Sequence, residues 1–176
     1  YKISHNGKTA YIHSKYVSTG SGSAGVSGGG GSSSPPAASG SGVSGTARRI
    51  VEEARALLRY GSRQFPYAAA TNGGRLGCAQ VVSTALKNAG IMRNIRLAVT
   101  QCVADLRSAG WREVRVPPYR AGDVITWNTT GRPDSHIGII MESGNSVRAM
   151  SNSSSQRRPR LHSATYCPVT RVLRRV

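Results

Sequence analysis

One cysteine and one histidine stand where their side chains could perform nucleophilic chemistry. Cys78 follows the turn-rich stretch Asn72-Gly-Gly-Arg-Leu-Gly77 and opens a segment with helical periodicity. A thiol in the first turn of a helix faces free backbone N–H groups and the positive end of the helix dipole, and both favour the thiolate. His136 begins the apolar run Ile137-Gly-Ile-Ile-Met141, which predicts an imidazole at the end of a strand. A cysteine on an early helix followed by a histidine on a later sheet is the arrangement in which an imidazole can accept the thiol proton.

The sequence does not predict a metal site or a cofactor. The three cysteines lack CxxC spacing, which disfavours structural zinc. The remaining histidines, His5, His13 and His162, have no metal-ligand spacing, and we assign them no role. Because the number of cysteines is odd, Cys102 and Cys167 could form a disulfide and leave Cys78 free. The alternative is two separate buried thiols.

Three helices are expected to position the cysteine. Thr46 can cap the first helix, whose apolar residues recur at three- and four-residue intervals up to Gly61. The second should run from about Cys78 to Asn88 and the third from Thr100 to Ala109, each followed closely by a glycine that can end it.

Strands are expected to position the histidine. After residue 111 the pattern predicts strands around residues 114–116, 124–127, 137–141, 147–150 and 170–176. Helices followed by strands predict an α+β domain with an antiparallel sheet, spanning residues 46–176.

Two further segments precede this domain. Residues 1–18 read as two short strands joined at Asn6-Gly7, a strong hairpin signal. A lone hairpin is marginal in water, so we expect it to be the end of a small barrel whose earlier strands lie upstream. Residues 19–45 are dominated by Gly and Ser, which predicts a flexible linker.

The chain is strongly basic. It has 24 Lys and Arg against 7 Asp and Glu, a formal net charge of +17, which favours polyanionic partners. Basic residues gather at 157–160 and 171–175. Aromatic residues make up only 6% and are not interleaved with the basic ones, which disfavours nucleic acid. The apolar runs are far shorter than the ~20 residues that span a bilayer.

Four motifs, in order across residues 46–176, resemble those of NlpC-type cell-wall peptidases of the papain-like group. Phe65-Pro66-Tyr67 resembles the family's Pro-Tyr, and Gly77-Cys78-Ala79-Gln80-Val81-Val82 stands where the family has Asp-Cys-Ser-Gly-Phe-Val. Tyr119-Arg-Ala-Gly122-Asp123-Val-Ile-Thr-Trp127 is similar to the family's PGD strand, and His136-Ile-Gly138-Ile to its H-V-G-I strand. Upstream, residues 6–17, NGKTAYIHSKYV, resemble the last strands of bacterial SH3-like domains, which commonly bind cell-wall peptides.

The resemblance implies a papain-like fold and a secreted or wall-associated peptidoglycan endopeptidase. Cys78 would attack the scissile carbonyl to form an acyl-enzyme, while His136 takes the thiol proton and later protonates the leaving amine. Backbone N–H groups near Cys78 would form the oxyanion hole, and Tyr67 would line the site. We expect a monomer that binds muropeptides and that anionic wall polymers attract.

The third catalytic residue is open to several interpretations. By the resemblance its position falls on Arg148, whose guanidinium cannot accept a hydrogen bond. Asn152 is chemically better, because its amide oxygen can accept the imidazole N–H. We predict Asn152 for this role, with Ser151 or a backbone carbonyl as alternatives.

Gly77 departs from the family pattern in a way that bears on the substrate. The family's acid at this position is tied to recognition of a free amine on the muropeptide, and glycine carries no charge. A CHAP-like endopeptidase or amidase cleavage is therefore an alternative to cleavage next to an N-terminal L-alanine. A non-catalytic wall-binding module is a second alternative, and nucleic-acid binding through charge alone is a third.

Overall fold

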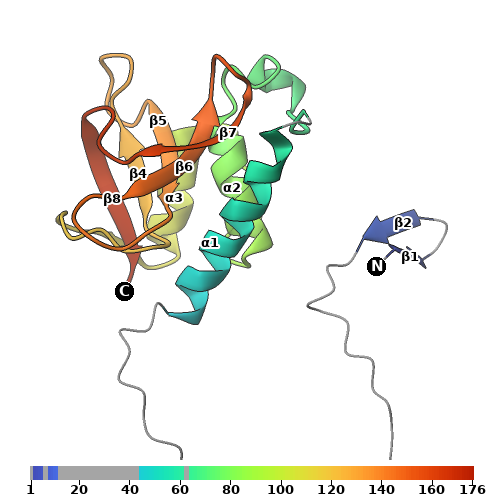
Figure 1. Cartoon of the computed structure of the whole chain (residues 1–176), viewed down its shortest axis with the longest axis horizontal. Helices are drawn as coiled ribbons and strands as arrows, with labels where there is room; N and C mark the ends of the chain where they lie inside the picture. The colour runs from blue at the N-terminus through green and yellow to red at the C-terminus, as the bar shows by residue number, and fades with distance from the viewer. Residues whose placement is uncertain (1, 6–7, 12–43, 62–63) are drawn as a thin grey trace, which may run out of the picture. The chain divides into compact units, whose positions relative to one another are not determined.

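The computed structural model describes residues 2–5, 8–11, 44–61 and 64–176 and divides the chain into two units (Figure 1). In the first unit, Tyr1–Ser39, strand β1 (Lys2–His5) pairs antiparallel with β2 (Lys8–Tyr11). The predicted Asn6-Gly7 turn and residues 19–43 of the predicted linker lie outside the described residues.

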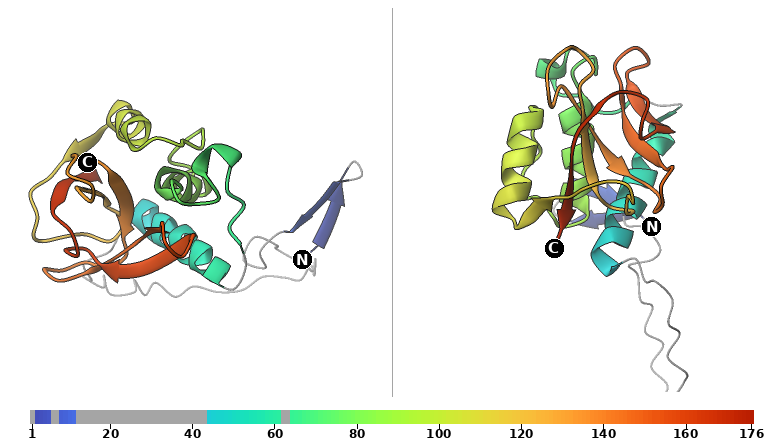
Figure 2. Two further views of the ribbon diagram at one scale, coloured as in Figure 1. Left: turned by 90° about the horizontal axis from the view of Figure 1, so that it is seen from above. Right: turned by 90° about the vertical axis from the view of Figure 1, so that its left-hand side faces the viewer.

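The second unit, Gly40–Val176, is an α+β domain, as the order of helices and strands predicted. Its helices are α1 (Gly45–Leu57), α2 (Cys78–Asn88) and α3 (Val99–Ser108). Its strands are β3 (Trp111–Glu113), β4 (Val124–Trp127), β5 (His136–Ile140), β6 (Arg148–Ser153), β7 (Arg158–Ser163) and β8 (Val169–Arg175). They form one antiparallel sheet in the order β3-β8-β4-β5-β6-β7, with the helices along one side (Figure 2). None of the described helices is long and apolar enough to cross a bilayer.

Each central strand of the sheet contributes to two separate cores. Ile137 and Ile139 of β5 pack with the helices, whereas Ile140 belongs to a second cluster with Trp127 of β4 on the other face. Because successive side chains of a strand alternate between faces, His136 projects to the same face as Ile140. The ring of Trp127 confirms this, since its centroid lies 5.6 Å from that of His136.

Gly138 lets Trp127 reach the histidine. A Cβ atom at Gly138 would lie 2.6 Å from the Trp127 ring and 2.8 Å from the carbonyl oxygen of Met150. The indole N–H of Trp127 donates a hydrogen bond to the carbonyl of Ala164 at 2.7 Å, which fixes the ring across Gly138. The glycine of the His136-Ile-Gly138-Ile motif therefore serves packing beside the imidazole.

One strand prediction was wrong and one strand was missed, and prolines lie at both places. The first strand of the domain is Trp111–Glu113, because Pro117 and Pro118 lack the N–H groups that a strand at 114–116 would need to continue. β7 was not predicted, since Pro159 and basic residues interrupt any apolar alternation. It lies at the edge of the sheet, where proline is tolerated.

The N-cap of the first helix lies two residues before the predicted cap, Thr46. Ser44 is the N-cap of α1, and its Oγ accepts a hydrogen bond from the N–H of Ala47 at 3.2 Å. Thr46 instead accepts a hydrogen bond from Arg175 at 3.2 Å.

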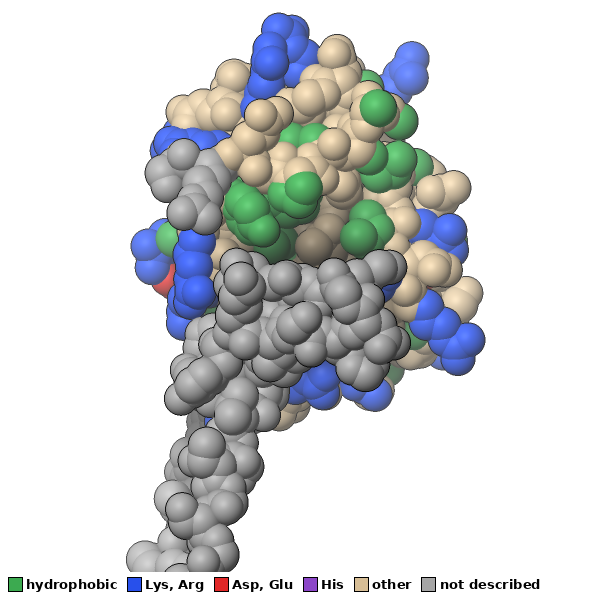
Figure 3. Space-filling model, turned by 90° about the vertical axis from the view of Figure 1, so that its right-hand side faces the viewer, with side chains coloured by type: hydrophobic (Ala, Val, Ile, Leu, Met, Phe, Trp, Pro, Cys, Tyr) green, Lys and Arg blue, Asp and Glu red, His purple; other side chains and the backbone are tan. Residues whose placement is uncertain are grey.

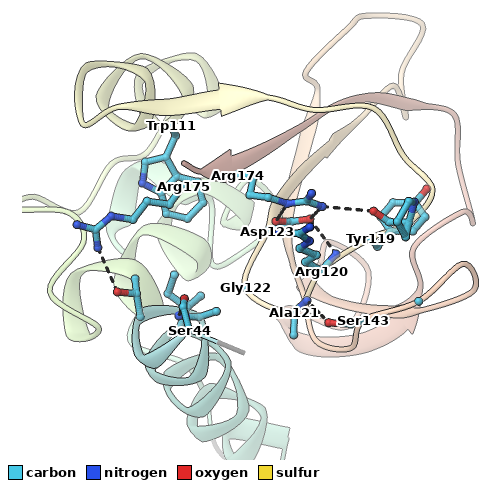
Figure 4. Close-up of a pocket in the computed structure, with 15 residues that line it drawn as sticks. Ser44, Trp111, Tyr119, Arg120, Ala121, Gly122, Asp123, Ser143, Arg174 and Arg175 are labelled. Carbon is cyan, nitrogen blue, oxygen red and sulfur yellow. Dashed lines mark hydrogen bonds and ion pairs between the residues drawn. The ribbon is translucent and has the colours of Figure 1, made fainter. Parts of the chain in front are cut away.

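The Gly122-Asp123 motif supplies a buried ion pair. Asp123 is 2% exposed and binds the Arg174 guanidinium through both carboxylate oxygens, at 2.8 and 2.7 Å. It also accepts the N–H of Arg120 at 2.9 Å. These residues line a cavity of about 740 Å³ near the start of α1, whose lining includes neither Cys78 nor His136 (Figure 4). The motif therefore has a structural role at the start of β4.

We expect Asp123→Asn to lower the free energy of unfolding by about 3–5 kcal/mol, because removing one partner leaves the other charge buried without compensation. The matched control is Asp105→Asn, which breaks the Arg96–Asp105 pair, about one-third exposed on each side. Its effect should be much smaller, since water screens exposed pairs. Chemical denaturation of both variants measures the difference, and equal losses would contradict the structural role of Asp123.

Candidate active site

Cys78 is the first residue of α2, as predicted, and its side chain is half-buried. Gly77 precedes it as N-cap and provides no side-chain hydrogen bond, so the first N–H groups of the helix remain available near the thiol. α2 contacts β5 and β6, and the thiol lies within hydrogen-bonding reach of the backbone at Ile137. Ile137 follows His136, so the thiol lies against the backbone at the start of β5, while the His136 side chain projects to the other face of the sheet.

The pKa of the Cys78 thiol differs in direction from the sequence-based expectation. Burial raises the pKa above its ordinary value, while backbone hydrogen bonds at Ala79, Ile137 and Cys78 itself lower it. The helix start acts in the predicted direction, but loss of hydration outweighs it. The resting thiol is therefore protonated at neutral pH.

His136 is buried, with 8% of its surface exposed. Burial, and secondarily the charge of His162, lowers the pKa of its imidazole to about 4. The ring is therefore neutral at pH 7 and keeps a lone pair that can accept a proton. Among the described residues, no hydrogen bond joins the thiol to this imidazole.

A chain of hydrogen bonds determines which nitrogen of His136 carries that lone pair. Nε2 of His136 lies 3.0 Å from the Ser151 hydroxyl, which lies 2.6 Å from Nε2 of His162. Nδ1 of His162 lies 2.9 Å from the carbonyl oxygen of Ser163, which can only accept, so this nitrogen is protonated.

The direction of each hydrogen bond in this series follows from the protonated Nδ1 of His162. With Nδ1 protonated, Nε2 of a neutral His162 must accept, so the Ser151 hydroxyl donates to it. Ser151 Oγ in turn accepts from Nε2–H of His136. Nδ1 of His136 is left as the proton acceptor, and it has no hydrogen-bond partner within the described part of the chain.

Asn152 does not contact His136, contrary to our prediction. It follows Ser151 on β6, so its side chain projects to the opposite face of the sheet. There its Oδ1 accepts a hydrogen bond from the Tyr67 hydroxyl, and its Nδ2 donates to the carbonyl of Gly74 at 2.7 Å. Ser151, the alternative, holds the imidazole instead.

Arg148, at the position that the family pattern indicated, also lies away from the imidazole. It pairs with Glu142 on the exposed end of β6, where its Nε donates to the carboxylate at 2.8 Å. Neither Asn152 nor Arg148 contacts the imidazole, and the orienting contact predicted for Asn152 is made by Ser151.

Tyr67 lies over the loop that leads to Cys78. A Cβ atom at Gly77 or at Gly74 would come within 2.5 Å of its ring. Gly77 has φ −90°, which any residue can adopt, so the packing against Tyr67 is what favours glycine. Gln80 holds the segment that carries the tyrosine, accepting from the Ala68 N–H at 3.0 Å and donating to the Pro66 carbonyl at 3.1 Å.

The hydroxyl of Tyr67 remains protonated, because burial raises its pKa to about 12. This hydroxyl donates to Asn152, while the ring packs against Gly77, next to Cys78. Tyr67 and Asn152 together tie the loop before Cys78 to β6.

A cavity of about 460 Å³ opens beside His136. Its lining consists of Thr129, His136, Ser151, Asn152, Ser153, Ser154, Ser155, Arg160, Leu161, His162, Tyr166 and Cys167. Hydroxyl groups predominate, and Tyr166, 46% exposed, packs its ring edge against that of His162. Arg160 is the permanently charged residue of this lining.

Cys102 and Cys167 are unpaired, so the possible disulfide is not formed. Cys102 is fully buried with the helices, whereas Cys167 packs against the cluster on the other face of the sheet. In the part of the chain that the structure describes, no three His, Cys, Asp or Glu side chains form a group that could hold a metal ion.

Sequence reasoning missed the roles of His162 and Arg160. Both lie on β7, which was not predicted, and both contribute to the face that carries Ser151. Arg158, Arg160 and His162 alternate along the sequence, and this alternation is what a strand with one polar face would show.

Comparison with known proteins gives a distant structural likeness. No family model and no curated protein matches the chain. Among solved structures it is similar to the crystal structure of Ly7917 with the hydrolyzing product of MDP, with 16% sequence identity and a TM-score of 0.42. The match covers 72% of this chain and 62% of that chain, which is less than two thirds of its length. The likeness is too distant to assign a function.

We expect alkylation of Cys78 by iodoacetamide to accelerate about tenfold per pH unit through neutral pH and to level off only above the ordinary thiol pKa of 9.0. The raised pKa leaves the thiol protonated below that range, so the thiolate fraction grows as pH rises. Mass spectrometry of the modified peptide gives the rate, and a Cys78→Ala protein identifies reaction at the other cysteines. A rate plateau between pH 5 and 7 would instead indicate a preformed thiolate–imidazolium pair.

Proposed function

We propose that this chain is a secreted, papain-like cysteine hydrolase that cleaves peptide bonds in the stem peptides of peptidoglycan. The observation that carries the proposal is the meeting of Cys78, at the start of α2, with the start of β5, where His136 keeps Nδ1 free while Ser151 holds Nε2. This arrangement fits a nucleophile, a general base and a group that orients the base.

In the proposed reaction, Nδ1 of His136 takes the thiol proton as Sγ of Cys78 attacks the scissile carbonyl. The free N–H groups in the first turn of α2 stabilise the oxyanion, an effect of about 3 kcal/mol for each donor. The tetrahedral intermediate collapses to a thioester as His136 protonates the leaving amine. Water then attacks the thioester with His136 as base, which releases the acid and restores the thiol.

The resting pair is neutral, because burial raises the pKa of Cys78 and lowers that of His136. Proton transfer therefore accompanies attack on the substrate. When His136 becomes protonated, its Nε2–H still donates to Ser151, whose hydroxyl donates to His162. The chain of hydrogen bonds thus suits both states of the base.

Peptidoglycan is the proposed substrate on the strength of the NlpC-like motifs and the basic charge. Lys and Arg side chains are spread around the face shown in Figure 3, where carboxylates are scarce, and this suits an anionic wall. Because Gly77 offers no carboxylate to a free amine, an internal peptide bond or a CHAP-like amide cleavage fits better than cleavage next to an N-terminal residue. The N-terminal segment, as the end of an SH3-like domain, would add wall binding.

We expect Cys78→Ala to abolish release of muropeptide fragments from purified peptidoglycan, since the variant has no nucleophile. Mass spectrometry of the soluble products measures cleavage and identifies the bond cut, and a sedimentation assay measures wall binding. Unaltered wall binding by the variant would show that it is folded. If the wild-type protein binds the wall and releases nothing, the chain is a binding module.

We expect Ser151→Ala and His162→Phe each to lower kcat by about 10- to 100-fold, because each breaks the chain that orients His136. His162→Gln should restore part of the loss, since its amide oxygen can accept from Ser151. Ser108→Ala, which removes an exposed hydroxyl at the end of α3 and outside the cavity, is the matched control and should retain activity.

The same chain can be checked without substrate by ¹⁵N chemical shifts of the two imidazoles. Nε2 of His136 and Nδ1 of His162 should carry the protons at pH 7. A proton on Nδ1 of His136 would contradict its role as the base.

A further inference from the structure

Arg160 lies beside the proposed base. In the pairing of β6 with β7, Arg160 stands directly opposite Ser151, so the two side chains project from the same face of the sheet. Ser151 holds the imidazole of His136 at 3.0 Å. Arg160 and His136 line the same cavity, and Ser151 stands between them on the neighbouring strand.

The guanidinium of Arg160 has no acidic partner in the described part of the chain. Five of the seven acidic side chains pair with other arginines: Asp105, Glu113, Asp123, Asp134 and Glu142. Arg160 is exposed, and it forms no ion pair or hydrogen bond with any described residue. Its charge is available to a ligand.

The cavity around Arg160 suits an anionic group. No Asp or Glu side chain contributes to its lining, and Thr129, Ser153, Ser154 and Ser155 add hydroxyl-bearing side chains to the same lining. The planar fork of a guanidinium matches the two oxygens of a carboxylate.

An unpaired cation at this place is unfavourable for the proposed reaction. Burial lowers the pKa of His162, a hydrogen bond from its ring to the backbone at Ser163 raises it, and the charge of Arg160 lowers it further. The proposed mechanism requires positive charge on His136, at the other end of the same hydrogen-bonded chain. A carboxylate bound to Arg160 would offset the repulsion at the moment when the base is protonated.

We propose that the cavity beside His136 is a subsite for a carboxylate of the substrate, with Arg160 as its anchor. The subsite rests on the proposed function, since it selects acidic stem peptides for the Cys78 centre. An uncharged Gly77 and a cationic Arg160 together favour a substrate that presents a carboxylate in place of a free amine near the scissile bond.

The test measures binding by the full chain carrying Cys78→Ala, so that cleavage does not interfere. The two probes are the synthetic tripeptide L-alanyl-γ-D-glutamyl-L-lysine and the same peptide with both carboxylates converted to carboxamides. Titration calorimetry should give about 10- to 100-fold tighter binding of the carboxylate form, the range of a bidentate charge-assisted contact.

Two arginine variants separate a subsite from general attraction to a basic protein. Arg160→Gln should bind both peptides equally, and Arg160→Lys should recover part of the preference through its charge. Arg157→Gln removes the same charge from an exposed residue of the β6–β7 turn that does not line the cavity, and it should keep the full preference.

The binding outcomes test the subsite separately from the hydrolase function. If the Cys78→Ala protein with both arginines intact binds the two peptides equally, or binds neither, the subsite is contradicted. Equal loss of preference in Arg157→Gln and Arg160→Gln contradicts it too. A protein that discriminates through Arg160 but hydrolyses no peptidoglycan would keep the subsite and lose the hydrolase function.

Discussion

The candidate site of this domain depends on the close approach of two element ends, the start of α2 and the start of β5. Helix packing against β5 and β6 places the Cys78 thiol against the backbone at Ile137, and His136 is the preceding residue. Trp127 crosses Gly138 and limits where the imidazole can lie. Packing on both faces of one strand therefore positions the Cys78 thiol on one side and the His136 imidazole on the other.

Burial controls the electrostatics of this site more strongly than the helix start does. The backbone near Cys78 lowers the thiol pKa, as a helix N-terminus should, but loss of hydration raises it by more. The same burial lowers the pKa of His136 to about 4. A neutral pair is the form that a dry site favours, because charge separation without substrate would leave two poorly hydrated ions.

β6 serves the site from both of its faces. Ser151 projects toward His136 and continues to His162 on the edge strand, whereas Asn152 projects the other way to Tyr67 and to the loop before Cys78. One strand therefore holds the imidazole of the proposed base and anchors the segment that leads to the proposed nucleophile. Shifting β6 by one residue would exchange these two roles, which makes its register a functional constraint.

The sequence by itself determined the α+β class, the bounds of α2 with Cys78 at its start, and the place of His136 at the head of a buried strand. These follow from local periodicity, glycine stops and apolar runs, which depend on neighbouring residues. Only the tertiary structure decided that Ser151 holds the imidazole and Asn152 does not, because the two adjacent side chains differ only in the face to which they project. The sequence likewise did not predict β7, which carries His162 and Arg160. An edge strand needs no apolar pattern, so only its pairing with β6 identifies it.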